Sequence, residues 1–166
     1  MYSKQDPDRA RPARPDLAIM IGPPAAGKST LCCTALADSH VRLNLDMLRD
    51  RSRERILFYA CLAAQQSCCL DNTSPTRQVR QPFIAAAHAA GFTCSAYWFH
   101  VADLDLCHKR NRSRAGAVPD VAVTSIFAKM QEPTFTEGFD HIYAVDSHDL
   151  STVEIDRRDL HAAVQE

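Results

Sequence analysis

The chain has 166 residues, of which 46% are hydrophobic and 23% are charged, and its formal net charge is -1. This length and composition are those of a single globular domain with its own core. The near-neutral charge argues against a protein that coats nucleic acid or binds membranes through a polybasic surface, and no apolar run approaches the ~18 residues of a membrane span.

The charges are unevenly distributed along the chain. Residues 42–114 carry 11 basic and 6 acidic side chains, whereas residues 115–166 carry 3 basic and 10 acidic ones. Of the 19 basic side chains, 15 are Arg, which clamps phosphate and carboxylate groups in a bidentate manner. The middle of the chain can therefore present a basic surface to an anion although the total charge is close to zero.

The expected elements begin after a Pro- and Arg-containing segment. Residues 1–15 lack the apolar core of a signal peptide, so they indicate a disordered tail, and the default location is the cytoplasm. Residues 17–21 are a continuous apolar run ending at Gly22, as in a buried parallel strand. The remaining expected elements are helices over 28–37, 51–66, 76–90, 103–112 and 119–131, and strands over 41–45, 67–70, 93–101 and 141–145.

Strands and helices alternate along most of the chain. This alternation predicts an α/β fold with a parallel five-stranded sheet covered by helices on both faces. We assign residues 16–148 to this one domain and residues 149–166 to a C-terminal tail or short helix.

A phosphate-binding loop follows the first expected strand. Residues 22–29 match the pattern G-x-x-x-x-G-K-[ST] between a strand and a helix. Lys28 should reach the β- and γ-phosphates of a nucleotide and Ser29 should bind Mg²⁺, while backbone N–H groups surround the phosphates. No guanine-reading N-K-x-D motif is present, so ATP is favoured. The expected nucleotide-binding residues of this loop are Gly22, Pro23, Pro24, Ala25, Ala26, Gly27, Lys28, Ser29 and Thr30.

Asp46 and Arg49 follow the second expected strand, and the carboxyl ends of strands are where α/β sheets bind ligands. Three residues apart, the two side chains share a face if a helical turn follows. Asp46 could then accept the proton of an attacking hydroxyl, and Arg49 could hold a phosphate of the acceptor. A helix-capping Asp beside a solvated Arg is the alternative, and the spacing alone leaves both interpretations open.

Two further segments suit a bound triphosphate. Four basic side chains lie between residues 109 and 114, and Arg110 and Arg114 share a helix face, which predicts an Arg-rich lid. The alternative is a basic helix end that complements its own dipole. Asp71 ends the third expected strand and is placed to hold Mg²⁺ together with Ser29, or else forms a simple turn.

Read together, these segments resemble the kinase domain of the 5′ polynucleotide kinases of phages and animals. The resemblance covers residues 17–146. It rests first on the P-loop and on Asn44-Leu45-Asp46 with Arg49, which is similar to the phage D-x-x-R signature. The segment from Leu70 to Pro75 is similar to the animal D-N-T-N-P segment, with Ser74 in place of Asn. The segment from Arg110 to Arg114 is similar to the phage lid, and residues 127–139 are similar to the pattern F-x-x-P-T-x-x-E-G-F.

The resemblance implies a P-loop kinase fold and a role for each matching residue. Asp46 would be the general base on a 5′-hydroxyl, and Arg49 would grip a phosphate of the acceptor strand. Lys28, Ser29, Arg110 and Arg114 would hold the phosphates of ATP together with Mg²⁺, with Lys28 and Arg114 also acting in catalysis. The substrate would be the 5′-hydroxyl end of a nucleic acid, and no membrane would be involved. The resemblance also admits a homo-oligomer.

Two other function classes share part of this pattern. Small-molecule P-loop kinases that act on nucleosides or sugars, or that are similar to zeta toxins, also use a P-loop, an Asp at a strand end and lid arginines. A non-catalytic nucleotide-binding module would need only the loop. Transfer of phosphate to an oligonucleotide, to a small molecule or to nothing distinguishes the three.

Overall fold

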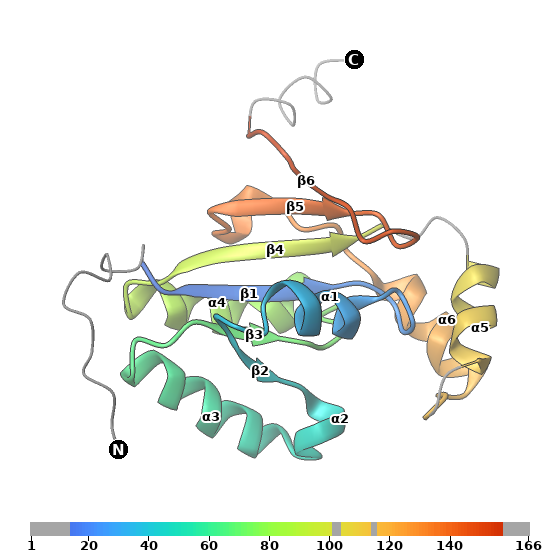
Figure 1. The fold of residues 1–166 in the computed structure, drawn as a ribbon, viewed down its shortest axis with the longest axis horizontal. Helices are drawn as coiled ribbons and strands as arrows, with labels where there is room; N and C mark the ends of the chain where they lie inside the picture. The colour runs from blue at the N-terminus through green and yellow to red at the C-terminus, as the bar shows by residue number, and fades with distance from the viewer. Residues whose placement is uncertain (1–13, 101–103, 114–115, 158–166) are drawn as a thin grey trace.

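The computed structural model describes residues 14–100, 104–113 and 116–157, and its centre is a six-stranded sheet (Figure 1). The strand order across the sheet is β2-β3-β1-β4-β5-β6. Neighbouring strands from β2 to β5 all pair in parallel, which confirms the expected parallel sheet of five strands. The strands are β1 (Asp16–Ile21), β2 (Val41–Leu43), β3 (Cys68–Leu70), β4 (Thr93–Phe99), β5 (His141–Val145) and β6 (Thr152–Glu154).

The sixth strand corrects the expectation of five strands. β6 pairs antiparallel with β5, with Glu154 opposite Tyr143, where the sequence indicates a tail or a short helix. It has three residues and all of them are exposed, so it lacks the alternation of buried and exposed side chains that marks a strand in a sequence. Only its pairing with the edge of β5 makes it a strand.

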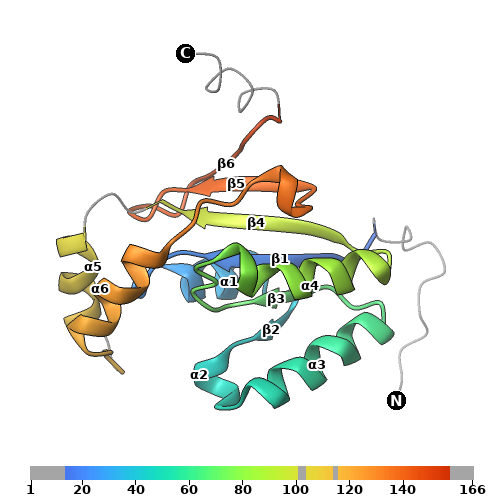
Figure 2. The same cartoon turned by 180° about the vertical axis from the view of Figure 1, so that it is seen from behind.

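Helices cover both faces of the sheet, as expected, because β1 is buried on both sides. Leu17, Ile19 and Ile21 pack in one core cluster with side chains of α3 (Arg51–Ala63) and α4 (Arg77–Ala89). Ala18 and Met20 point the other way and pack against α1 (Lys28–Ala35). Figure 1 shows α1 in front of the sheet, and Figure 2 shows α4 in front from the opposite side.

Polar side chains cap the N-termini of α3 and α4. Asp50 accepts a hydrogen bond from the Ser52 amide at 2.6 Å and starts α3, and Thr76 starts α4, which runs through Pro82. Within the described residues, no helix is long and apolar enough to cross a membrane. Two short helices were not expected, α2 (Leu45–Leu48) and the 3₁₀ helix η1 (Phe135–Glu137), while α5 (Leu104–Arg112) and α6 (Asp120–Lys129) match expectation.

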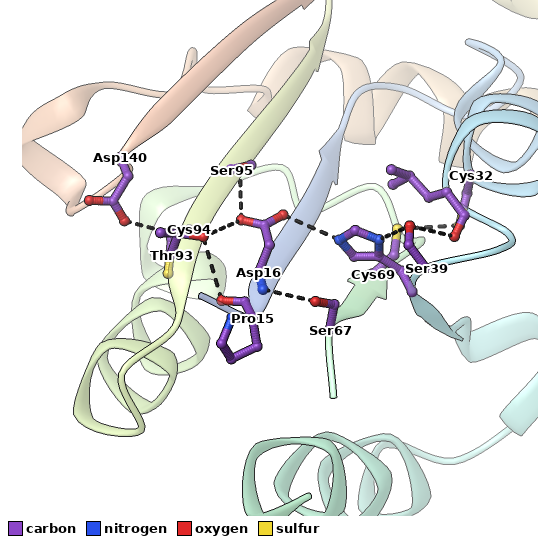
Figure 3. Close-up of polar contacts among 12 residues, drawn as sticks. Pro15, Asp16, Cys32, Ser39, Ser67, Cys69, Thr93, Cys94, Ser95 and Asp140 are labelled. Carbon is purple, nitrogen blue, oxygen red and sulfur yellow. Dashed lines mark hydrogen bonds and ion pairs between the residues drawn. The ribbon is translucent and has the colours of Figure 1, made fainter. Parts of the chain in front are cut away.

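Polar side chains join the strands at the end of the sheet where β1 begins (Figure 3). The Asp16 carboxylate accepts hydrogen bonds from the Ser95 hydroxyl at 2.8 Å and from the Thr93 hydroxyl at 3.0 Å. The backbone amide of Asp16 donates to the Ser67 hydroxyl at 3.0 Å. These bonds tie β1 to β4 and to the residue before β3, so the register of the central strands is held at this end of the sheet.

A buried ion pair ties α4 to η1. The Arg80 guanidinium, in a residue that is 1% exposed, donates from two nitrogens to the two carboxylate oxygens of Glu137, each at 2.8 Å. Its third nitrogen donates to the carbonyls of Ser74 and Gln131, each at 3.0 Å. Glu137 is part of the segment 127–139 that the sequence singles out. Because Arg80 also binds the carbonyl of Ser74, the ion pair supports the loop that follows β3. Ser74 lies in this loop, three residues beyond Asp71.

Candidate active site

The loop after β1 needs glycine at both ends for different reasons. A Cβ on Gly22 would come within 2.8 Å of the Cβ of Phe99, so the position requires a residue without a side chain. Gly27 has φ +100°, in the left-handed region, and a Cβ there would meet Leu150 at 2.8 Å. Ala25 also lies in the left-handed region. These turns bring the chain back on itself and direct the N-terminus of α1 toward the loop.

Lys28 lies inside this loop, while Ser29 and Thr30 are exposed in the first turn of α1. The Lys28 ammonium donates to the Pro23 carbonyl at 2.6 Å, and the residue is 8% exposed. A buried cation beside a helix N-terminus creates a strongly positive site for an anion, because little water screens it.

The loop forms one wall of a cleft of about 580 Å³. The other walls come from α2, from the loop after β3, and from the pair α5–α6, which stands at the carboxyl end of the parallel strands (Figure 1). Parallel α/β sheets bind their ligands at this end. The lining residues are Pro24, Ala25, Gly27, Lys28, Ser29, Thr30, Asn44, Leu45, Asp46, Asp71, Asn72, Thr73, Arg110, Val118 and Ile126.

Asp71 is buried against this cleft with one carboxylate oxygen engaged and the other unpaired. Its Oδ2 accepts from Arg42 Nε at 2.8 Å and from Asn44 Nδ2 at 3.1 Å. Its Oδ1 is buried and has no hydrogen-bond partner among the described residues. This oxygen and the Ser29 hydroxyl belong to residues that line the same cleft. Such a pair fits a hard cation such as Mg²⁺, which binds carboxylate, hydroxyl and water oxygens.

Asn44 places Asp46 in the cleft. The Asn44 Oδ1 atom accepts a hydrogen bond from the Met47 amide at 3.0 Å, so Asn44 caps α2 and ends β2 two residues earlier than expected. Asp46 sits in the first turn of α2, exposed to the cleft. The alternative in which Asp46 is the capping residue is therefore wrong. Within the described part of the chain, its carboxylate forms no hydrogen bond or ion pair.

Three supporting residues of the site escaped the sequence analysis. Arg42 and Asn44 hold Asp71, and Asn72 joins two elements by accepting from the Leu45 amide at 3.0 Å and donating to Glu54 at 2.5 Å. The partners of these bonds are 18 to 29 residues apart in the chain. No local pattern signals such contacts, although Asn44 and Asn72 belong to two of the five segments that carry the resemblance.

The predicted arginines have different placements. Arg110 of α5 lines the cleft. Arg112 turns away and pairs with Asp120, with Nε 3.1 Å from Oδ2. Arg49 is exposed and does not line the cleft, and it ends α2 with φ +61°. Arg114 lies outside the described residues. In the loop itself, Gly22, Pro23 and Ala26 are buried behind the cleft wall.

Glu54 gives the site a pH-dependent stability. Burial raises the pKa of its carboxyl, and the hydrogen bond from Asn72 opposes this only in part. The folded state therefore favours the protonated form, and the stability that Glu54 contributes is lost as the pH rises through its raised pKa. We expect Glu54→Gln, which stays neutral and can still accept from Asn72, to gain stability relative to the wild type as the pH rises.

Urea unfolding of both proteins between about pH 4 and about pH 7 measures this effect, since that range begins near the ordinary pKa of a glutamate and extends above it, in the direction in which burial raises the pKa of Glu54. Glu132→Gln removes an equal charge from an exposed side chain and serves as the matched control. A difference between Glu54→Gln and wild type that stays constant with pH would contradict the expectation.

Comparison with known proteins supplies the family. Residues 17–133 match the family model described as AAA domain. The chain belongs to this family. It is 26% identical over 137 residues to a bifunctional polynucleotide phosphatase/kinase of Schizosaccharomyces pombe, a match that covers 78% of this chain and 33% of the relative. The chain thus spans about a third of the length of that curated relative.

Solved structures similar to this AAA domain confirm its fold. A fungal RNA kinase matches with a TM-score of 0.64 at 13% identity, covering 81% of this chain and 39% of the other. A gluconokinase from Sinorhizobium meliloti 1021 matches with a TM-score of 0.57 at 15% identity, covering 83% and 86%. The fold is that of the P-loop kinases, and the resemblance to polynucleotide kinases inferred from the sequence motifs is confirmed.

Proposed function

We propose that this protein transfers the γ-phosphoryl group of ATP to the 5′-hydroxyl end of a nucleic acid strand. One observation carries the proposal: the exposed Asp46 carboxylate, the buried Lys28 ammonium and Arg110 line the same cleft. The family and the neighbouring kinase folds support phosphoryl transfer from ATP. The relative named as a polynucleotide phosphatase/kinase and the fungal RNA kinase support a polynucleotide as the acceptor.

The cleft supplies the groups that phosphoryl transfer requires. The loop amides and Lys28 bind the β- and γ-phosphates, and Arg110, with Arg114 as the sequence expects, covers them and stabilises the charge of the transition state. Ser29 and Asp71 would hold Mg²⁺, which supplies charge neutralisation on the phosphate oxygens when bound.

Asp46 would act on the acceptor. It accepts the proton of the 5′-hydroxyl as the new oxygen–phosphorus bond forms and the bond from the γ-phosphorus to the bridging oxygen of ADP breaks. Asn44 and Asn72 fix the position of α2 and so the approach of this carboxylate. Arg49 lies one helical turn beyond Asp46, outside the ATP cleft, which suits a contact with a phosphate of the acceptor.

A small-molecule kinase is the second candidate. The gluconokinase matches over 86% of its own length, so a chain of this fold and size accommodates a sugar acid as acceptor. The same cleft residues would then serve a different acceptor, and only the groups beyond Asp46 would differ.

Transfer of labelled phosphate distinguishes the two candidates. The protein is incubated with γ-labelled ATP, Mg²⁺ and a 5′-hydroxyl oligonucleotide, with gluconate and a nucleoside in parallel reactions. We expect label on the oligonucleotide alone, and none on a matched oligonucleotide that already carries a 5′-phosphate. Label on gluconate or the nucleoside but not on the oligonucleotide would overturn the proposal in favour of a small-molecule kinase.

A further inference from the structure

A second hollow lies between α3 and α4, separate from the ATP cleft. It has a volume of about 330 Å³ and none of its lining residues lines the cleft. The two helices run along the same face of the sheet (Figure 2). We call this hollow the α3–α4 groove, and its lining residues are Arg51, Glu54, Arg55, Phe58, Tyr59, Pro82 and Phe83.

The groove combines aromatic rings with positive charge. Arg51, Arg55 and Tyr59 recur every fourth residue along α3 and so follow one stripe of the helix. Arg51 and Arg55 are exposed, and Tyr59 is 52% exposed. Below them, the Phe58 and Phe83 rings meet edge to face, with centroids 5.0 Å apart. The exposed Tyr59 ring and this aromatic floor thus lie next to two arginines in one groove.

Among the described residues that line the groove, one is acidic, and its side chain turns inward. Glu54 is 1% exposed and accepts the hydrogen bond from Asn72, so the charge at the rim of the groove comes from Arg51 and Arg55. The ligand is therefore expected to be an anion that also presents flat apolar surfaces. Single-stranded nucleic acid has this chemistry, because its bases stack on aromatic rings and its phosphates pair with Arg.

The groove adjoins the acceptor side of the cleft. Asn72 lines the cleft, Glu54 lines the groove, and the hydrogen bond between them forms the wall that the two hollows share. Arg51 is the first residue of α3, and α3 directly follows α2, the helix that contains Asp46. A strand whose 5′ end reaches Asp46 can continue over this wall into the groove.

We propose that the α3–α4 groove binds the single-stranded nucleotides next to the 5′ end of the acceptor, with a base stacked on Tyr59 and a phosphate held by Arg51 and Arg55. The proposal rests on the proposed polynucleotide kinase activity and adds to it a site for acceptor length. The groove would make a strand a better acceptor than a single nucleotide, because a nucleotide that ends at Asp46 cannot reach Tyr59.

Acceptors of two lengths test this proposal. The acceptors are a 5′-hydroxyl single strand of about ten nucleotides, within the usual span of such sites, and a nucleoside 3′-monophosphate. For the long acceptor, we expect Tyr59→Ala to raise KM about tenfold, the size of one lost base–aromatic stack, with kcat unchanged. For the nucleoside 3′-monophosphate, we expect no change. Tyr59→Phe, which keeps the ring, should restore the wild-type KM.

Two variants on the same helix are matched controls. Ile56 is 68% exposed and Arg53 is exposed, and neither lines the groove. We expect Ile56→Ala and Arg53→Ala to leave the KM for the long acceptor within about twofold, whereas Arg55→Ala raises it. Equal losses from Arg55→Ala and Arg53→Ala would indicate a loose attraction to the whole helix and would overturn the groove.

Direct binding separates this proposal from the proposed function. The fluorescence anisotropy of a 3′-labelled single strand reports binding whether or not phosphate is transferred. Wild-type binding that Tyr59→Ala weakens, without transfer to any oligonucleotide, would support the groove and reject the kinase activity. Transfer to both acceptors with unchanged KM and unchanged anisotropy in Tyr59→Ala would retain the kinase and reject the groove, as expected if a protein segment occupies it.

Discussion

Replacing Asp46 by Asn should leave ATP binding intact and lower the rate of phosphoryl transfer by about 10²- to 10⁴-fold, the usual contribution of a general base. The amide has the same shape as the carboxylate but cannot accept the proton of the acceptor hydroxyl. Since the Asp46 carboxylate makes no hydrogen bond or ion pair within the described residues, the substitution removes no structural contact. Steady-state transfer to a 5′-hydroxyl oligonucleotide and equilibrium binding of ATP measure the two effects separately.

Asp38→Asn is the control for this variant. Asp38 is exposed in the turn after α1 and does not line the cleft, so the same change of charge there should leave the rate within about twofold. An Asp46→Asn protein that transfers phosphate at the wild-type rate would show that another group takes the proton. A protein that loses ATP binding in proportion to its rate would show that Asp46 serves the nucleotide instead of the acceptor.

Glu137→Gln should destabilise the fold by about 3–5 kcal/mol, because it leaves the buried Arg80 charge without its counter-ion. This is a large part of the roughly 5–15 kcal/mol that stabilises a typical domain. Both oxygens of Glu137 bind Arg80 at 2.8 Å, and Oε1 also accepts from the Thr134 amide at 3.0 Å. Urea unfolding of the purified variant and of the wild type gives the difference in free energy.

Arg77 provides a matched control for the same ion pair. Its Nε lies 3.6 Å from Glu137, and its side chain is 55% exposed, so Arg77→Gln should cost less than about 1 kcal/mol. The double variant Arg80→Met with Glu137→Leu should recover part of the stability lost in Glu137→Gln, since an apolar pair leaves no unpaired charge in the core. A loss of similar size in Arg77→Gln and Glu137→Gln would contradict this account of Arg80.

The secondary structure of the parallel sheet could be predicted because its signals are local. The run from Leu17 to Ile21 is apolar on both faces, as a central parallel strand requires. The end of β2 and the existence of β6 could not be predicted in the same way. β2 stops before Asn44 because the Asn44 side chain caps α2, and β6 exists because the edge of β5 accepts its pairing.

The candidate site was predicted in part for the same reason. Lys28 and Ser29 belong to a contiguous motif, and a contiguous motif carries its geometry in its backbone. Asp46, Asp71 and Arg110 come from three separate segments, and they meet at the cleft because parallel strands end at one edge of the sheet. Arg49 shares a motif with Asp46 but lies outside the cleft, since α2 ends at Arg49 and the chain turns there.

By itself, the sequence determined the phosphate-binding loop, the α/β class and the order of the central elements, because these depend on neighbouring residues. Only the tertiary structure decided which side chains support the site. Arg42 and Asn44 hold Asp71, Asn72 joins Glu54 to α2, and Arg80 binds Glu137 from 57 residues away. Each of these contacts joins segments that only folding brings together, and the buried polar groups stay there because each finds its partner across the fold.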